Sequence, residues 1–362
     1  MTTPSLFNGR YARQIAVREI GPDGQRRLAA ASVLIVGCGA LGGAQAELLA
    51  RMGIGRLRLV DRDVVEPGNL PRQLLYDERD AAEGTPKALA AANRLRAINS
   101  QLVLDARPAN AAADTIEGLL EGMDLVLDGT DNVETRYLLN DACVKHGKPW
   151  VHGGVAGTVG IVLPVMPNSG PCLRCLFPTP PPAAEVRTCA TDGVLNTAVV
   201  QVASQQVTFA CKIILGQPVA GSLLHVDAWA QTSRLARLRP VPDCPCCQRR
   251  DFTFLESDTL PLASAVCGRD TVRVSARVWN EFQLTPDALP RQFRQAGLTV
   301  TAKGLLTEIL ADHRRFTLFP DGTLMVHECT DPATALAAVG RLAHHATQPT
   351  NRPPALSYTA LE

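Results

Sequence analysis

The sequence predicts an α/β protein with a doubly wound, mixed but mostly parallel sheet, followed by a small α+β domain. Three observations support this prediction. Short apolar runs rich in β-branched residues alternate with helical patterns between residues 33 and about 165, as they do where helices connect parallel strands. A glycine-rich turn follows the first of these runs. After about residue 260, alternating strand patterns and a hairpin signal replace the earlier alternation.

The first strand and the first helix of the sheet flank a glycine-rich turn in residues 33–43, VLIVGCGALGG. The run VLIV suits a strand buried on both faces, and Ala44–Met52 suits a helix. Between them, Gly37, Gly39 and Gly42 form G-x-G-x-x-G. Without side chains there, backbone amides and the positive end of the helix can approach a phosphate. The motif indicates a Rossmann-like nucleotide site, but not which nucleotide it binds.

The next elements continue the alternation. The strand LRLVD ends on Asp61, about 20 residues after the glycines, where an acidic residue usually accepts hydrogen bonds from a ribose. Further strands are expected at Leu102–Ala106, Asp124–Asp128, Pro149–His152 and Val159–Val165, and helices at Pro86–Ile98, Ala111–Leu120 and Thr135–His146. Ligands should gather at the carboxyl ends of these strands.

The remaining elements complete two expected domains. A helix over 194–215 and a strand pair over 222–241 finish the first domain. In the second, TVRVSARV and the hairpin FTLFPDGTLMVHE read as strands, and Asp287–Gln295 and Ala333–His345 read as helices. We expect a nucleotide-binding domain over 1–255, a small α+β domain over 256–346 that recruits a partner, and a flexible tail over 347–362.

Composition and charge narrow the class of function. The chain has 362 residues, of which 46% are hydrophobic, so it can bury a large core. A net charge of +1 argues against nucleic-acid and membrane partners. The N-terminus lacks a basic-then-apolar leader. The most apolar long stretch, Val194–Leu215, is interrupted by polar residues such as Asn196 and Lys212. We therefore expect a cytoplasmic protein.

Two C-x-x-C pairs predict a metal site. Cys172 and Cys175 form the first pair, and Cys244 and Cys247 form the second. Four thiolates suit tetrahedral Zn²⁺ and leave no open coordination position, so the zinc would be structural. Cys246 is the spare cysteine of CPCC, and a site that uses it instead remains open.

Charged residues after the glycines indicate which chemistry the nucleotide undergoes. The segment DRDVVEPGNLPRQ contains Asp61, Asp63, Arg72 and Gln73. Cations around a nucleotide with an acid opposite suit chemistry at phosphorus. Arg72 and Lys87 would hold the phosphates, and Asp131 in DGTDN would hold Mg²⁺. An NAD oxidoreductase explains only the glycines and the first acid.

Seven motifs lie between Arg10 and about Cys247: RYARQ, GCGALG, DRD…NLPRQ, TPKA, DGTDN, the CLRC/CPCC pair and TCATDGV. These motifs, and the order in which they occur, resemble those of the ubiquitin-activating superfamily, especially the bacterial MoeB/ThiF adenylyltransferases. The resemblance implies ATP-dependent adenylation of the C-terminal glycine of a small ubiquitin-like or sulfur-carrier protein, with release of pyrophosphate. Positioning and charge neutralisation would supply most of the catalysis.

The resemblance also implies roles for individual residues. Asp61 would bind the ribose and Asp131 would hold Mg²⁺, although Asp131 could also cap the helix after it. Arg13 would reach the γ-phosphate of the partner subunit in a homodimer. Phosphates would be held by Asn69, Arg72 and Lys87, and further nucleotide contacts are implied for Gly37, Gly39, Gly42, Asp63, Gln73 and Asn132.

Cys189 decides between two continuations of the reaction. Arg187 and the start of the following helix both favour a thiolate at Cys189, although a buried hydrophobic role is the ordinary alternative. The resemblance implies that Cys189 takes the activated carboxyl as a thioester for transfer to a conjugating enzyme, or joins the sulfur carrier in a persulfide linkage. In the alternative, a sulfur donor consumes the adenylate and forms a thiocarboxylate for molybdopterin, thiamine or cysteine synthesis.

Two other hypotheses explain less of the sequence. A catalytically dead binding subunit would have no reason to retain Asp61, Arg72, Lys87 and Asp131 together. Adenylation of a non-protein acceptor, such as a tRNA base, fits poorly with the neutral charge balance.

Overall fold

The computed structural model describes residues 9–181, 192–256, 262–265, 270–303 and 306–347. The chain forms two compact units, Met1–Leu260 and Pro261–Glu362. Cys189 and the tail after Thr347 lie outside the described residues. Among the described helices, none has both the length and the apolar character to cross a membrane.

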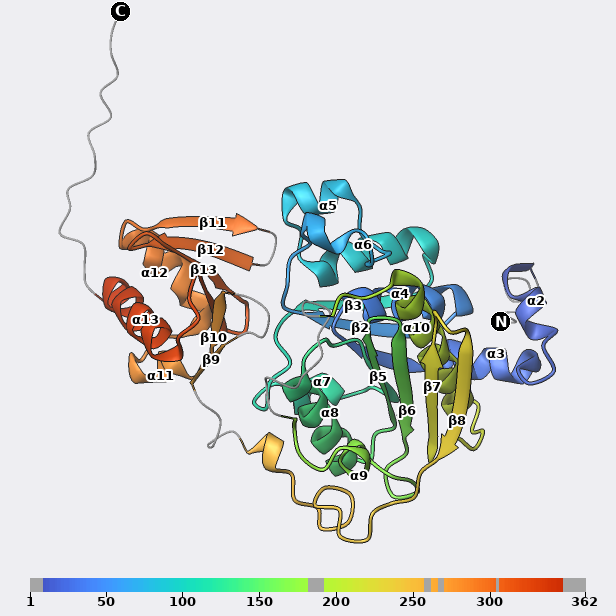
Figure 1. Cartoon of the computed structure of the whole chain (residues 1–362). Coiled ribbons are helices and arrows are strands. Elements are labelled where there is room, and N and C mark those ends of the chain that lie inside the picture. Colours follow the sequence, from blue (N-terminus) through green and yellow to red (C-terminus); the bar gives the residue numbers. More distant parts are fainter. Residues whose placement is uncertain (1–8, 182–191, 257–261, 266–269, 304–305, 348–362) are drawn as a thin grey trace, which may run out of the picture. The chain divides into compact units, whose positions relative to one another are not determined.

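The first unit is built on an eight-stranded sheet in the order β3-β2-β1-β4-β5-β6-β7-β8 (Figure 1). The strands from β3 to β5 are parallel, and β6, β7 and β8 join by antiparallel pairing. This mixed sheet confirms the predicted fold class. The strands are β1 Ser32–Val36, β2 Arg56–Asp61, β3 Val103–Pro108, β4 Leu125–Asp128, β5 Trp150–Ala156, β6 Val159–Val165, β7 Ser222–Asp227 and β8 Thr232–Arg237.

Helices cover both faces of this sheet (Figure 1). Alternate residues of β1 belong to two different hydrophobic cores: Val33 and Ile35 pack with one set of helices, and Leu34 and Val36 with the other. This double burial explains why the strand reads as a continuous apolar run. The helices are α2 Ala12–Ile15, α3 Gly21–Ala30, α4 Ala40–Met52, α5 Glu78–Glu83, α6 Lys87–Ile98, α7 Ile116–Leu120, α8 Val133–Lys145, α9 Leu173–Leu176 and α10 Asn196–Ile214.

The second unit is an antiparallel sheet of six strands in the order β11-β12-β13-β14-β10-β9, with helices packed on it. Its hairpin of β13 and β14 confirms the predicted turn at Pro320–Gly322. The strands are β9 Ala263–Ala265, β10 Thr271–Val274, β11 Thr299–Lys303, β12 Leu306–Ala311, β13 Arg314–Leu318 and β14 Leu324–His327. The helices are α11 Val278–Glu281, α12 Leu289–Gln295 and α13 Pro332–Thr347.

Four predicted elements were wrong in extent. The helix expected from Ala44 begins at Ala40, and the strand expected to end at His152 runs to Ala156. The strand expected through Val278 ends at Val274, and α11 follows, because the Trp279 indole is buried and donates to the carbonyl of Gly322 at 2.7 Å. The helix expected from Ala111 begins only at Ile116. Before it, the Thr115 hydroxyl hydrogen-bonds with local backbone groups and so competes with helix formation.

Candidate nucleotide site and metal site

One pocket of the first unit lies at the carboxyl ends of the parallel strands. Its walls come from the ends of β1, β2, β4 and β5 and from the loop after β3, where ligands of doubly wound sheets bind. Most of the predicted nucleotide contacts line it: Gly37, Gly39, Asp61, Asp63, Arg72, Gln73, Lys87, Asp131 and Asn132.

The glycines of this pocket have two different functions. Gly39 caps α4, and a side chain there would have no atom closer than 3.7 Å, so the position is open to a ligand. Gly37 has a φ of +87°, which favours glycine. A Cβ on Gly42 or on Gly129 would overlap the carbonyl oxygen of Gly37. Gly42 does not line the pocket; it allows α4 to pack directly on the glycine loop.

Asp61 holds the glycine loop in place. One of its carboxylate oxygens accepts the amide of Cys38 at 2.6 Å, and the other accepts the amide of Asp63 at 2.7 Å. Burial raises the pKa of Asp61, against the opposing effect of the Lys87 charge. A carboxylate has about four acceptor positions, so Asp61 can still accept a ribose hydroxyl while it binds both amides.

Lys87 begins α6 and is held beside the loop that follows Asp61. Its Nζ lies 3.2 Å from the carboxylate of Asp63, and its amide donates to the Asp63 carbonyl at 2.9 Å. The buried hydroxyl of Tyr76 lies 2.6 Å from the carbonyl oxygen of Cys38 and 3.2 Å from that of Lys87. Tyr76 therefore joins the glycine loop to the start of α6.

The segment NLPRQ contributes two pocket residues and one structural residue. Arg72 donates to the carbonyl of Gly68 at 2.7 Å and lines the pocket. The Gln73 side chain also lines it, is 4% exposed, and its Oε1 has no hydrogen-bond partner in the described part of the chain. Asn69 instead accepts the amide of Glu66 at 3.0 Å and does not line the pocket.

A buried network supports the pocket at the end of β4, and sequence analysis missed it. Asp128 accepts the hydroxyl of Thr130 at 2.6 Å and Nδ1 of His152 at 2.7 Å, and Nε of Arg136 lies 3.5 Å away. Burial opposes ionisation of Asp128, but the hydrogen bond from His152 and the charge of Arg136 outweigh it and lower its pKa. Burial also lowers the pKa of His152. The pair is therefore an ionised carboxylate beside a neutral imidazole.

The positions of Asp128 and His152 in the sequence could have indicated that the two side chains meet. Asp128 and His152 both end predicted strands, and the structure makes those strands neighbours. The exposed Asp131 follows in the same loop. Asn132, and not Asp131, caps α8, because its Oδ1 accepts the amide of Thr135 at 2.9 Å.

Arg13 stands apart from the pocket. It lies on α2, is exposed, and is not among the pocket's lining residues. Within one copy of the chain, the structure therefore does not bring it to the nucleotide site.

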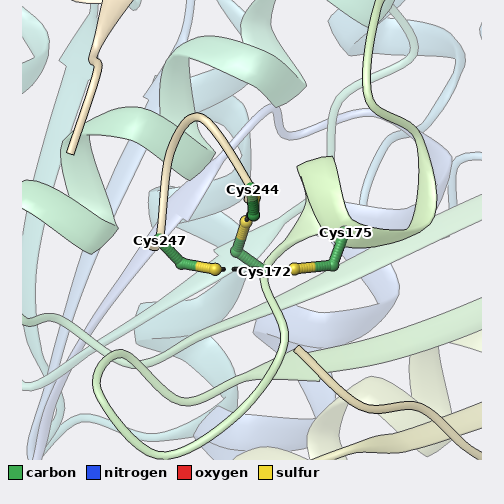
Figure 2. A group of neighbouring side chains, drawn as sticks. All are labelled: Cys172, Cys175, Cys244 and Cys247. Atoms are coloured by element: carbon green, nitrogen blue, oxygen red, sulfur yellow. Dashed lines mark hydrogen bonds between the residues drawn. The ribbon is translucent and has the colours of Figure 1, made fainter. Parts of the chain in front are cut away.

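The predicted cysteines form one cluster (Figure 2). The sulfurs of Cys172, Cys175, Cys244 and Cys247 all lie within 4.8 Å of one another, and none forms a disulfide. Four ligands about 2.3 Å from a tetrahedral zinc ion would have similar spacings. The hydrogen bond with Cys172 and burial raise the pKa of Cys175 to about 12. The thiols therefore need a cation to ionise together, and the cluster suits structural Zn²⁺.

Cys246 serves a different purpose from the four ligands. Its buried sulfur accepts a hydrogen bond from Nδ2 of Asn140 at 3.1 Å. The same Asn140 accepts the amide of Leu173 at 2.8 Å. Because Asn140 lies on α8, it ties both cysteine segments to that helix. The structure therefore supports Cys247, and not Cys246, as the fourth cysteine of the metal site.

The fold and these two sites define a nucleotide-binding α/β protein with a separate structural metal centre. The model of the ThiF family matches residues 11–246. The chain therefore belongs to the ThiF family, which confirms the predicted superfamily of adenylyltransferases.

The chain is also similar to individual proteins of known name. The chain is 40% identical to a protein of Bacillus subtilis named sulfur carrier protein ThiS adenylyltransferase, over 91% of this chain and 97% of that one. It is also 40% identical to the SAMP-activating enzyme E1 of Haloferax volcanii, over 70% of this chain and 96% of that one. The crystal structure of Escherichia coli MccB matches with a TM-score of 0.59 at 19% identity, over 67% of this chain and 73% of that one. This last match supports the fold.

Proposed function

We propose that this protein adenylates the C-terminal glycine of a small sulfur-carrier protein in the cytoplasm. A carboxylate oxygen of that glycine attacks the α-phosphorus of ATP. The bond from this phosphorus to the oxygen shared with the β-phosphate breaks, and pyrophosphate leaves with the electron pair. The products are an acyl-adenylate and pyrophosphate.

The observation that carries this proposal is the pocket itself. It combines a glycine loop at a helix start, a ribose acceptor in Asp61, and two cations in Arg72 and Lys87. Asp131 lines the pocket from the loop after β4 and would hold Mg²⁺, which when bound neutralises charge on the pyrophosphate. The orphaned Oε1 of Gln73 suits a ligand that brings its own donor, as a nucleotide does.

The match to the ThiS adenylyltransferase favours a sulfur carrier over transfer to a conjugating enzyme. That match covers 91% of the chain, so it must include most of the second unit, Pro261–Glu362. The match to the SAMP-activating enzyme covers 70%. The second unit would then belong to the sulfur-carrier pathway, as a surface that binds the carrier or the sulfur donor.

The nucleotide site would be completed by a second copy of the chain. In a homodimer, Arg13 of one subunit would reach the γ-phosphate in the other, which accounts for its exposed position on α2. Cys189 remains a predicted carrier of the activated carboxyl or of sulfur. Intact mass with and without reductant, compared between wild type and Cys189→Ala, would detect or exclude such an adduct.

The proposed function is tested by carrier-dependent exchange of pyrophosphate into ATP. The probes are ThiS of Bacillus subtilis and a SAMP of Haloferax volcanii. We expect Asp131→Asn to reduce exchange at least about 100-fold, in the range of a lost electrostatic contact to a transition state. Asp124→Asn is the matched control, because Asp124 lies at the other end of β4 and accepts the amide of Ser32 at 2.8 Å. Wild-type protein that binds ATP but catalyses no exchange with either carrier would refute the proposal.

A further inference from the structure

The part of the pocket formed after β4 contains a cation that has no role among the residues expected to bind the nucleotide. Arg136 lies in the first turn of α8, and its side chain is 21% exposed and lines the pocket. The expected phosphate ligands, Arg72 and Lys87, come from other elements. Arg136 is therefore available for a second anionic group.

The guanidinium of Arg136 is fixed before any ligand binds. Nη2 donates to the carbonyl of Thr130 at 2.9 Å, and Nε lies 3.5 Å from the carboxylate of Asp128. Asp128 is in turn held by His152 and Thr130. Among the described residues, the buried Nε has no hydrogen-bond partner, and Nη1 donates no hydrogen bond. The side chain thus presents a donor to the pocket without losing further freedom.

The order of the strands separates this cation from the ribose end. Asp61 ends β2, whereas Arg136 follows β4, and β1 lies between the two strands. Neighbouring strands are about 4.8 Å apart, so the two ends of the pocket are separated by roughly 10 Å. The lining of the pocket also includes Val155 of β5, the strand next to β4, and Val199 of α10. An apolar wall next to one cation suits an extended peptide end better than a triphosphate.

We propose that Arg136 binds the terminal carboxylate of the carrier protein and orients it toward the α-phosphate. This inference rests on the proposed function and names the residue that recognises its second substrate. The guanidinium would hold one carboxylate oxygen by a charge-assisted hydrogen bond. It would also offset the repulsion between the carboxylate and the phosphate it attacks. The other oxygen stays free to form the new bond to phosphorus.

The test compares two forms of one carrier with three forms of the protein. The carrier is ThiS of Bacillus subtilis with either its free C-terminal carboxylate or a C-terminal carboxamide, and binding is measured by calorimetry with the ATP analogue AMPCPP present. Wild-type protein should bind the carboxylate form at least about 10-fold more tightly, as expected for a charged hydrogen bond. Arg136→Gln should bind both forms alike, and Arg136→Lys should recover part of the preference.

Controls separate this role from a structural one. Lys145→Gln removes a cation from the last turn of α8, where Lys145 pairs with Glu117 outside the pocket; it should keep the full preference. Affinity for AMPCPP alone should change by less than about twofold in Arg136→Gln, since the phosphates have other ligands.

Of four informative results, three would overturn the inference and one would overturn only the proposed function. A full preference for the carboxylate in Arg136→Gln would place the carboxylate elsewhere. A loss of AMPCPP affinity as large as the loss of carrier affinity would make Arg136 a phosphate ligand. Wild-type protein that binds carrier and AMPCPP, shows the preference, and yet catalyses no pyrophosphate exchange would refute the proposed function while leaving the carboxylate contact intact. Wild type without any preference would refute the contact itself.

Discussion

Gly42 and Gly43 are neighbours in the first turn of α4, yet a methyl group would meet different surroundings at each. At Gly42, the new Cβ would overlap the carbonyl oxygen of Gly37 and lie 3.2 Å from Cγ2 of Ile35. At Gly43, the nearest atom would be Cγ of Leu75 at 3.7 Å, an ordinary van der Waals distance. The pair of alanine variants therefore separates the effect of a clash from the general effect of replacing glycine in a helix.

The expected changes in stability have opposite signs. Alanine instead of glycine in a helix stabilises by about 0.5–1 kcal/mol. Overpacking costs about 1–3 kcal/mol, and the upper value applies to Gly42 because the backbone it meets cannot rotate away. Gly42→Ala should therefore lower the free energy of unfolding by about 2 kcal/mol, and Gly43→Ala should raise it by about 0.5–1 kcal/mol. At about 2–4 °C per kcal/mol, the two melting temperatures should differ by roughly 5–12 °C.

Calorimetric melting and titration with AMPCPP would measure both consequences. Gly42→Ala should also weaken AMPCPP binding at least about 10-fold, because the displaced loop carries the amides expected to face the phosphates. Gly43→Ala should leave binding unchanged. If Gly42→Ala melted like wild type and bound AMPCPP normally, the direct packing of α4 on the glycine loop could not be what requires glycine there.

Three further perturbations test other parts of the structure. Cys247→Ser should release most of the zinc and lower the melting temperature, whereas Cys329→Ser in the second unit should retain one zinc per chain by elemental analysis. Because burial lowers the pKa of His152 below 6.5, the unfolded chain takes up that proton first. As the pH falls below 6.5, the free energy of unfolding should decrease by up to about 1.4 kcal/mol per pH unit. In urea titrations, His152→Asn should make this decrease smaller. Tyr76→Phe leaves the buried carbonyl of Cys38 without its hydroxyl donor. It should raise the KM for ATP with little change in kcat, and an unchanged KM would remove Tyr76 from the positioning of the loop.

Local patterns in the sequence predicted the first unit well because its physical causes are local. The double burial of β1 appears as an unbroken apolar run, and G-x-G-x-x-G marks the turn after it. The cysteine spacing likewise specified the metal site up to the choice between Cys246 and Cys247. Only the structure resolved that choice, since it depends on the hydrogen bond from Asn140, which lies far away in sequence.

The residues of the site were predicted less completely, because their contacts join segments that are far apart in the sequence. Asn69 was assigned to the phosphates from its motif, but its side chain binds the amide of Glu66 and does not line the pocket. The network of Asp128, His152 and Arg136 was missed because it joins β4, β5 and α8. Nothing in the local sequence shows that the ends of these elements meet. Motifs specify the groups that contact a ligand, whereas the residues that position them become visible only once strands are neighbours.

The charges around the pocket explain why the proposed reaction would need magnesium. The lining residues include four cations, Arg62, Arg72, Lys87 and Arg136, and three acids, Asp61, Asp63 and Asp131. Two of the cations are already close to acids, since Lys87 lies beside Asp63 and Arg136 beside the buried Asp128. The protein alone therefore offers little net positive charge to a triphosphate that carries about four negative charges. A divalent cation at the exposed Asp131 would make up this deficit.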